Sequence, residues 1–480
     1  MIQEWRAKLG SSYWVIAAGL AVSLLNVLFL LTEQYWGLLL PFAIAGVVLL
    51  VLALDKVLLF LAFATPLSLF YFNEKLHLGA SLPTEPILLG LLILFIGRLL
   101  YDGRFDARVL RHPLTLAILF YLLWMGISTF TSRLPGISAK YLLAQMWFVA
   151  VFYLLYSQLY RTRKYIFTSL WLYLVPLAAV VLYTVIRHAS YGFTHFASGW
   201  VMTPFFKEHT SYGAALALYL PVSVLFIVMP RFNLNRKLIG VLLTLVLLVG
   251  VILSYTRAAW VSLAIAGLVG LFLYLKISDW VFYALAAVFL GGLVYFQDDL
   301  REVFQENEST SSDNLTEHVE SISNITTDAS NLERINRWKS AFRMFSEKPL
   351  VGHGPGTYMF LYAPYQKPYE KTIISTNAGD LGNAHSEYIG PLAETGVPGT
   401  LSVLLIVYLT ITTGVRVYRR MEDPQLRLLA LALLMGLVTY WVHGLLNNFL
   451  TMDKLALPVW SFTAALVVLD VHFRREEGSS

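Results

Sequence analysis

The stretch from His385 to Gly399 concentrates the residue types that could do chemistry. Its pattern predicts a short helix that begins near His385 and breaks at Gly396, with a new helix from Pro398, because proline suits a first helical turn. The positive end of a helix disfavours an imidazolium, so we expect a neutral His385 that can accept a proton near pH 7. A general base needs this property. The alternative is that His385 only bonds the backbone at a helix start.

Two acids in the same stretch, Glu387 and Glu394, are seven residues apart and would share one face of the predicted helix. They could orient a cation, or they could favour the first helical turn through their charge. The second interpretation is the stronger one for Glu387, and the two are evenly balanced for Glu394.

Arg257 lies between two apolar stretches, in the segment Ser254–Trp260, and no acid is adjacent to it in the sequence. An arginine at that depth either reaches out to the interface or binds an anion, and its planar guanidinium matches phosphate oxygens. On these residues alone the two interpretations are balanced.

Six further basic residues are expected on the same side of the membrane, namely Arg133, Lys140, Lys207, His209, Arg334 and Arg337. Each of them taken alone is better explained by contact with water or lipid headgroups. Taken together they suit an anionic headgroup.

The composition predicts a chain embedded in a membrane. Of its 480 residues, 57% are hydrophobic and only 14% are charged, and the mean hydropathy is +0.64, which is too apolar for a soluble protein. A helix of about 20 apolar residues crosses the hydrocarbon core, and about fourteen such stretches occur. The predicted fold is therefore all-α and polytopic. The expected spans are Tyr13–Leu31, Trp36–Leu54, Val57–Phe72, Pro86–Leu100, Pro113–Phe130, Tyr141–Tyr160, Tyr165–Ile186, Ser211–Met229, Leu238–Ser254, Ala258–Leu275, Trp280–Phe296, Pro398–Tyr418, Leu426–Leu446 and Leu455–His472.

Basic residues cluster in every second connection between these spans, which is the distribution expected for cytoplasmic loops. Both termini are then predicted to be cytoplasmic, and the long segment 297–397 lies on the outer side. Three regions follow: residues 1–296 with eleven spans, residues 297–397 as a large outer loop, and residues 398–480 with three spans.

The outer loop is predicted to contain an amphipathic helix. Residues 298–331 are acidic and polar, and a capping-box pattern follows at Ser330–Glu333. Apolar residues then recur at helical spacing on one face, at Ile335, Trp338, Phe342 and Phe345. Such a helix would carry Arg334 and Arg337 toward the membrane surface.

Several functions are disfavoured by what the sequence lacks. The chain has no cysteine, which excludes disulfides, thiolate metal sites and cysteine nucleophiles. The sequence has neither a metal-ligand spacing nor a Walker loop, so we expect no metal, no cofactor and no nucleotide hydrolysis. The basic residues are dispersed, which argues against a nucleic-acid partner. Acids within the spans are scarce, which disfavours a proton-coupled transporter.

These motifs together resemble the O-antigen ligase and O-antigen polymerase superfamily. The first is the histidine signature, with His385, Ser386, Glu394, Gly396 and Gly399 in the matching positions. The second is the arginine corner Ser254–Trp260, with Arg257 in the arginine position and Tyr255 beside it. The third runs from Arg334 and Trp338 to the turn Pro349–Gly354. The resemblance covers roughly the second half of the chain, although family members more often have about twelve spans.

The resemblance implies a metal-independent glycosyltransferase of GT-C-like architecture in the bacterial inner membrane. Its donor would be an undecaprenyl-diphosphate-linked glycan and its acceptor a lipid A-core or another glycan. By family analogy, His385 would deprotonate the acceptor hydroxyl, which attacks the anomeric carbon with inversion. Arg257 and Arg334, with Lys207, His209 and Arg337 as weaker candidates, would hold the diphosphate.

Several alternatives share these motifs. A ligase is expected first, but a polymerase that joins repeat units and a protein O-oligosaccharyltransferase have the same signatures. A flippase or exporter of the same lipid-linked glycan would use the cations along a pathway and would need no base. A structural membrane scaffold would leave the outer cations dispersed and would not need Arg257.

Overall fold

The computed structural model describes residues 52–73, 78–101, 105–278, 329–372, 375 and 382–473, with scattered positions between 20 and 32. Ten helices in these ranges are long and apolar enough to cross a membrane, so the predicted all-α polytopic fold is confirmed. They are α5 Thr84–Tyr101, α7 Pro113–Phe130, the continuous helix Pro135–Leu159, α10 Arg163–Ala189, α12 His209–Val228, α13 Leu234–Leu253, α14 Arg257–Tyr274, α20 Ile389–Arg420, α21 Pro424–His443 and α22 Asp453–His472.

Shorter elements connect these helices. The continuous helix consists of α8 Pro135–Phe148, a π-helical segment Val149–Leu155 and α9 Tyr156–Leu159. The others are α4 Leu54–Ala64, the 3-10 turn Thr65–Leu67, strands β1 Leu69–Asn73 and β2 Leu78–Leu82, α6 Ala107–Leu110, α11 His195–Ser198, α18 Ala329–Glu347, α19 Tyr358–Leu361 and the 3-10 turns Ala363–Tyr365 and Pro368–Glu370.

Each of the ten helices overlaps a predicted span. A further predicted span, Val57–Phe72, is not helical over its whole length. The stretch expected as a helix at Val57–Phe72 is helical only as far as Leu67, and β1 begins at Leu69 and pairs antiparallel with β2. Pro66 explains the change, because it lacks the N–H that would continue the α-helix. The span predicted at Trp280–Phe296 lies outside the described residues, Trp36–Leu54 lies almost entirely outside them, and Tyr13–Leu31 is described only at scattered positions.

Local sequence explains where helices begin. The α21 helix starts at Pro424, whose missing N–H costs nothing in a first turn. The carboxylate of the preceding Asp423 accepts hydrogen bonds from the N–H groups of Gln425 and Leu426, as an N-cap residue should. This capped start fixes the register of α21, the helix whose last residue lies beside the candidate site.

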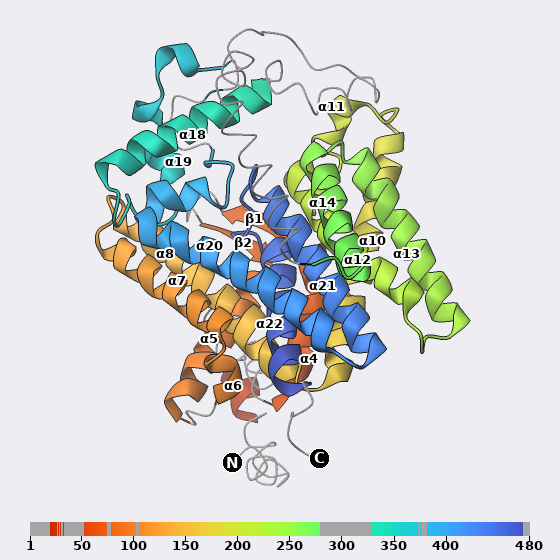
Figure 1. The fold of residues 1–480 in the computed structure, drawn as a ribbon. Coiled ribbons are helices and arrows are strands. Elements are labelled where there is room, and N and C mark those ends of the chain that lie inside the picture. Colours follow the sequence, from red (N-terminus) through yellow and green to blue (C-terminus); the bar gives the residue numbers. More distant parts are fainter. Residues whose placement is uncertain are drawn as a thin grey trace.

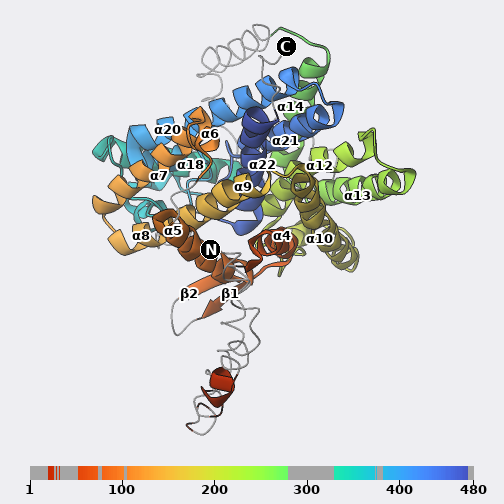
Figure 2. The same ribbon diagram turned by 90° about the horizontal axis from the view of Figure 1, so that it is seen from below.

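The helix α22 is the centre of the bundle (Figure 2). It is the most buried of the ten described spans, and it packs against α20, α21 and the π-helical segment. The helices α12, α13 and α14 form a group that contacts α21 on one side, and α7 packs against α20 on the other (Figure 1). The candidate site is built where these two groups meet the outer loop.

Loops that the charge pattern assigns to the outer side contact one another. The N–H of Arg133 donates to the carbonyl of His353 at 3.0 Å, and the N–H of Glu387 donates to the carbonyl of Gly444 at 2.8 Å. These bonds join three different connections of the chain at one end of the bundle.

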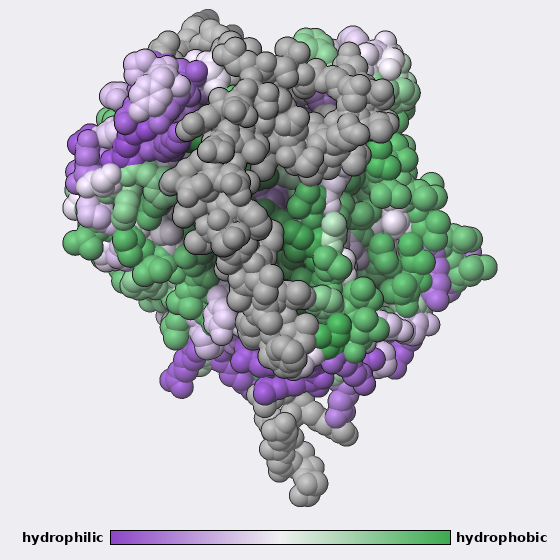
Figure 3. All heavy atoms as spheres, turned by 45° about the horizontal axis from the view of Figure 1, so that its top comes forward, coloured by the Kyte–Doolittle hydropathy of each residue, from purple (hydrophilic) through white to green (hydrophobic). Residues whose placement is uncertain are grey.

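The opposite end gathers the basic connections. Arg163 pairs with Asp423 at 2.7 Å, and Arg416 pairs with Asp470 at 3.3 Å. Figure 3 shows apolar residues over the side of the molecule, between a hydrophilic lower rim and a hydrophilic region at the upper left where α18 lies. This division fits a membrane-spanning bundle, and which end is cytoplasmic stays a prediction.

The predicted helix of the outer loop is present as α18, but its start and its buried face differ from the prediction. The helix already includes Ala329, so Ser330 is inside it and is not a cap. Phe342 is 49% exposed. The buried face is instead mostly polar, and consists of Glu333, Asn336, Arg337, Ser340, Ala341 and Met344. Polar partners in the outer loop therefore outweigh the apolar pattern in orienting α18.

The boundary predicted at residue 296 lies outside the described residues. At the other end of the loop, α20 begins at Ile389, before the predicted boundary at residue 397, and it runs through a bend at Gly396 into the span. The division into three regions is otherwise a prediction.

Candidate active site

Two glycine turns lock the outer loop onto α20. Gly352 and Gly396 have φ values of +67° and +69°, a backbone conformation that favours glycine. A Cβ atom on Gly352 would lie 2.3 Å from the carbonyl of Glu394, and one on Gly396 would lie 2.3 Å from the carbonyl oxygen of Leu350. The predicted break at Gly396 is thus confirmed, and it is where two of the sequence motifs meet.

Glu394 and Gly399 support this junction from α20. The carboxylate of Glu394 accepts a hydrogen bond from the N–H of Tyr358 at 3.0 Å. A Cβ atom on Gly399 would collide with the side chain of Thr395, and the carbonyl of Thr395 accepts a bond from the indole of Trp124 at 2.8 Å. Glu394 therefore holds backbone of the outer loop.

His385 precedes α20 instead of beginning it. Its backbone is left-handed, with φ of 47°, and its N–H donates to the side-chain oxygen of Asn383 at 2.9 Å. The hydroxyl of Ser386 accepts bonds from the N–H groups of Tyr388 and Ile389 at 3.2 and 3.3 Å. The helix start predicted near His385 is therefore wrong by four residues, because α20 begins at Ile389 with Tyr388 as its N-cap residue.

Burial and neighbouring cations make His385 neutral. Burial disfavours the imidazolium, and Arg334 and Arg337 repel it, so the pKa of His385 falls to about 3; a hydrogen bond with Asn447 offsets this in part. The ring is therefore unprotonated at neutral pH, as the general-base interpretation requires. The cause is burial beside two guanidinium groups, and not the helix end.

Arg334, whose charge acts on His385, forms a cationic pair with Arg257. Burial and the charge of Arg257 lower the pKa of Arg334 to about 10, and Glu208 acts in the opposite direction. Arg257 is the first residue of α14, whereas Arg334 lies on α18. Two guanidinium groups close enough to repel each other, with one carboxylate near them, favour binding of a further anion.

The corner before Arg257 is held by hydrogen bonds. Tyr255 has a left-handed backbone with φ of 50°, and its hydroxyl donates to the carbonyl of Phe193 at 3.2 Å. The hydroxyl of Thr256 donates to the carbonyl of His209 at 3.0 Å. The starts of α12 and α14 are thereby tied together, and His209 is brought to the edge of the site.

The remaining predicted cations occupy different environments. The guanidinium of Arg337 donates to Glu333 at 2.8 Å and to the carbonyl of Asn383 at 3.2 Å, so it holds the segment before His385. Lys207 is exposed and acts on Glu208. Trp338 is half-buried on α18. Among the predicted cations, Arg257 and Arg334 lie close enough together for the charge of one to act on the other.

Sequence reasoning missed Asn447, which contacts His385, and His443, which contacts Asn447. Asn447 hydrogen-bonds to it from the loop between α21 and α22. His443, the last residue of α21, lies close enough to Arg334 and His209 for their charges to act on it. A histidine at the outer end of an apolar span was the available signal, but its spatial relation to His385 depends on how α21 packs.

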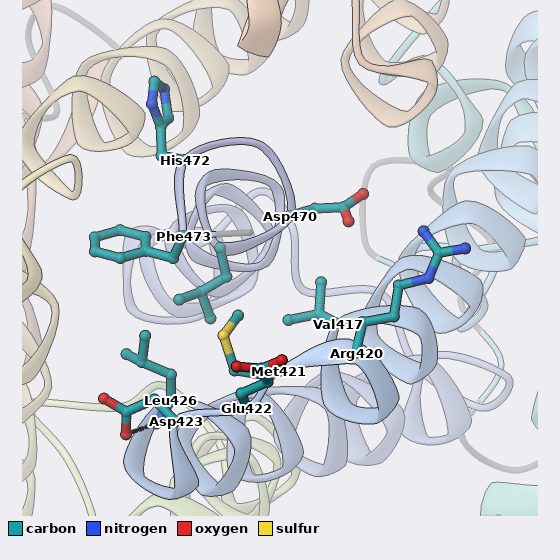
Figure 4. A pocket seen from close by; sticks show the side chains of 10 residues that line it. Val417, Arg420, Met421, Glu422, Asp423, Leu426, Asp470, His472 and Phe473 are labelled. Carbon is teal, nitrogen blue, oxygen red and sulfur yellow. Dashed lines mark hydrogen bonds between the residues drawn. The ribbon is translucent and has the colours of Figure 1, made fainter. Parts of the chain in front are cut away.

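Two cavities among the described residues lie away from the pair of Arg257 and Arg334. One of about 260 Å³ borders the His385 segment, although His385 is not among its lining residues. Another, of about 640 Å³, lies at the far end of the bundle between the ends of α20, α21 and α22. Figure 4 shows Arg420 and Asp470 extending to one side of this second cavity, which contains none of the predicted site residues.

The fold and the site define a polytopic helical membrane protein with a histidine and a pair of arginines gathered under an outer loop. Residues 242–404 match the family model described as O-antigen ligase. The match includes Arg257, Arg334 and His385 and supports the predicted resemblance of this part of the chain to the O-antigen ligase superfamily. No curated protein matches the chain.

Proposed function

We propose that the protein transfers a glycan from undecaprenyl diphosphate to an acceptor hydroxyl, with a lipid A-core as the acceptor, at the periplasmic face of the bacterial inner membrane. The observation that carries the proposal is the grouping of neutral His385 with Arg334, whose charge acts on it, and of Arg334 with Arg257. The family match supports a ligase or polymerase type of activity in general.

The chemistry follows from these groups. The free nitrogen of the His385 ring takes the proton of the acceptor hydroxyl as the oxygen attacks the anomeric carbon from the face opposite the diphosphate. The bond between the anomeric carbon and the phosphate oxygen breaks, so configuration inverts and undecaprenyl diphosphate leaves. Negative charge grows on the leaving oxygen, where Arg334 and Arg257 stabilise it. The guanidinium groups would take the part that a metal ion has in other transferases.

Substituting the base tests the proposal directly. Purified protein in nanodiscs would be incubated with an undecaprenyl-diphosphate oligosaccharide and lipid A-core, and glycan transfer would be followed by mass shift. His385→Ala should lower transfer at least about 10²-fold, as expected for loss of a general base, while binding of the donor changes little. His472→Gln, at the far end of the bundle, is the control. Full transfer by His385→Ala would contradict the proposal.

The diphosphate clamp has a matched control on the same helix. Arg334→Lys keeps the charge but loses the planar fork that binds phosphate oxygens in pairs. Arg343 also lies on α18 and pairs with Glu370 at 2.6 Å. We expect Arg334→Lys and Arg257→Lys to raise the Kd for undecaprenyl diphosphate roughly tenfold or more, and Arg343→Lys to leave it unchanged. Equal changes in this Kd for all three substitutions would contradict a diphosphate-binding role of Arg334 and Arg257.

The same assay separates the competing functions. Replacing lipid A-core by a second molecule of donor tests a polymerase, and replacing it by a protein acceptor tests a protein O-oligosaccharyltransferase. A flippase should translocate the donor in proteoliposomes with or without His385. A scaffold should show neither transfer nor translocation.

A further inference from the structure

The candidate base His385 is the first of three polar side chains that form a chain of contacts. Asn447 is 3% exposed and hydrogen-bonds to His385. Its side-chain nitrogen lies 3.4 Å from Nδ1 of His443, which is 1% exposed. The order is therefore His385, Asn447, His443, and both groups behind the base are shielded from solvent.

The amide of Asn447 has one accepting and one donating end, which fixes how these contacts are made. With its nitrogen directed at Nδ1 of His443, the amide oxygen is left to accept from the ring N–H of His385. This oxygen stabilises the protonated ring, since the bond raises the pKa of His385. The other nitrogen of His385 then carries the lone pair that a base needs.

The loop that carries Asn447 is tied to the His385 segment on both sides. The carboxylate of Glu387 accepts bonds from the N–H groups of Phe449 and Leu450 at 2.7 and 3.0 Å. The N–H of Glu387 donates to the carbonyl of Gly444 at 2.8 Å. Two residues after His385, the chain is thus clamped to residues on either side of Asn447, which holds the amide in place.

We propose that Asn447 is the positioning residue of His385, and that His443 fixes the orientation of the Asn447 amide. The inference rests on the transferase function proposed above. The proton of the acceptor hydroxyl passes to His385, and Asn447 stabilises the resulting imidazolium without itself losing or gaining a proton. A third group that orients the base is a recurring arrangement in nucleophilic catalysis.

His443 also connects this chain of contacts to the donor. Its Nε2 atom is buried and has no hydrogen-bond partner among the residues that the structure describes. A buried N–H without an acceptor is costly. Because Arg334 is near enough to act on His443, a phosphate oxygen of the donor held by Arg334 supplies that acceptor.

Asn447 variants test the inference in the transfer assay, with Asn448→Ala as the neighbouring control. Asn447→Ala should lower kcat roughly 10²-fold with little change in the donor KM, whereas Asn448→Ala should retain activity. Asn447→Asp should move the acid limb of the kcat profile to higher pH, because a carboxylate favours the imidazolium. Melting temperatures separate loss of folding from loss of positioning.

Substitutions of His443 provide a second test, which can still be made if the Asn447 variants fold poorly. Glutamine can still accept from the Asn447 amide, so His443→Gln should retain several times more activity than His443→Phe. If wild-type protein transfers glycan and His385→Ala does not, but Asn447→Ala and Asn447→Asp match Asn448→Ala in rate and pH profile, the positioning role is overturned. If wild-type protein transfers nothing, the proposed function fails instead.

Discussion

Glu333 and Arg337 form a buried ion pair one helical turn apart on α18. The Nε atom of Arg337 lies 2.8 Å from a carboxylate oxygen of Glu333, and the two side chains are only 6% and 4% exposed. Arg337 also donates to the carbonyl of Asn383. The pair therefore links the interior of the outer loop to the segment that positions His385.

Glu333→Gln should destabilise the protein strongly. The substitution leaves the guanidinium of Arg337 buried without its carboxylate, and breaking such a pair costs about 3–5 kcal/mol. Glu347→Gln is the matched control, because Glu347 pairs with Arg133 at the surface, where both side chains are more than 40% exposed. That exposed pair should contribute about 0–1 kcal/mol. Thermal unfolding in detergent measures both, and equal shifts in melting temperature would contradict the buried role.

Gly352→Ala should prevent the two glycine turns from meeting. The left-handed backbone alone costs a side chain about 1–3 kcal/mol, and the new Cβ would lie 2.3 Å from the carbonyl of Glu394. Gly126→Ala, in α7 with no atom within 4 Å of the new Cβ, should be neutral or slightly stabilising. Folded yield and melting temperature report the difference, and a Gly352→Ala protein as stable as Gly126→Ala would count against the interlocked turns.

The pH dependence of transfer should differ between kcat/KM for the donor and kcat. Burial, Arg334 and Arg337 lower the pKa of His385 to about 3 in the free protein. Activity needs the neutral ring, so it falls as pH drops through this pKa, and kcat/KM should show no acid limb above about pH 4. A bound diphosphate offsets the two arginines and raises the pKa, which moves the acid limb of kcat to higher pH. Initial rates between pH 4 and 9 test this, and coincident limbs near the ordinary histidine pKa would refute it.

The spans could be predicted from the sequence because each is a continuous apolar stretch, and ten of them coincide with described helices. The departure at Val57–Phe72 has a local cause in Pro66. The orientation of α18 could not be predicted in this way. The apolar face that the spacing predicts is not the buried face of α18. The buried face is instead held by the ion pair of Glu333 and Arg337 and by the bond between Asn336 and Gln366 at 2.8 Å. Gln366 and Asn383, which bond Asn336 and Arg337, lie elsewhere in the loop and leave no periodic signal in the sequence of α18.

The candidate site was predictable to the extent that motifs mark it. Residue type and resemblance single out His385, Arg257 and Arg334. In the structure the charge of Arg257 acts on Arg334, and the charge of Arg334 acts on His385. Arg337 and Asn447 show what the motifs could not predict. Arg337 is three residues from Arg334 and has the same chemistry, yet it faces Glu333. Asn447 reaches His385 only because α21 packs beside the start of α20, which depends on tertiary contacts.

Glu387→Ala should detach the loop that carries Asn447 from the His385 segment. One carboxylate oxygen of Glu387 accepts bonds from Phe449 and Leu450 and from the hydroxyl of Tyr440 at 2.5 Å. Alanine leaves two buried N–H groups without an acceptor, at about 1–3 kcal/mol each. Transfer and melting temperature should therefore fall together.

Glu387→Gln separates the acceptor from its charge. The amide oxygen of glutamine can still accept the same bonds, so this variant should keep transfer within a few fold of wild type. If charge on Glu387 were what matters, as in the interpretation that it orients a cation, glutamine should be as damaging as alanine. Parallel melting curves and transfer rates for the two variants decide between a hydrogen-bonding anchor and a charged ligand, because only the anchor predicts that glutamine rescues the loss.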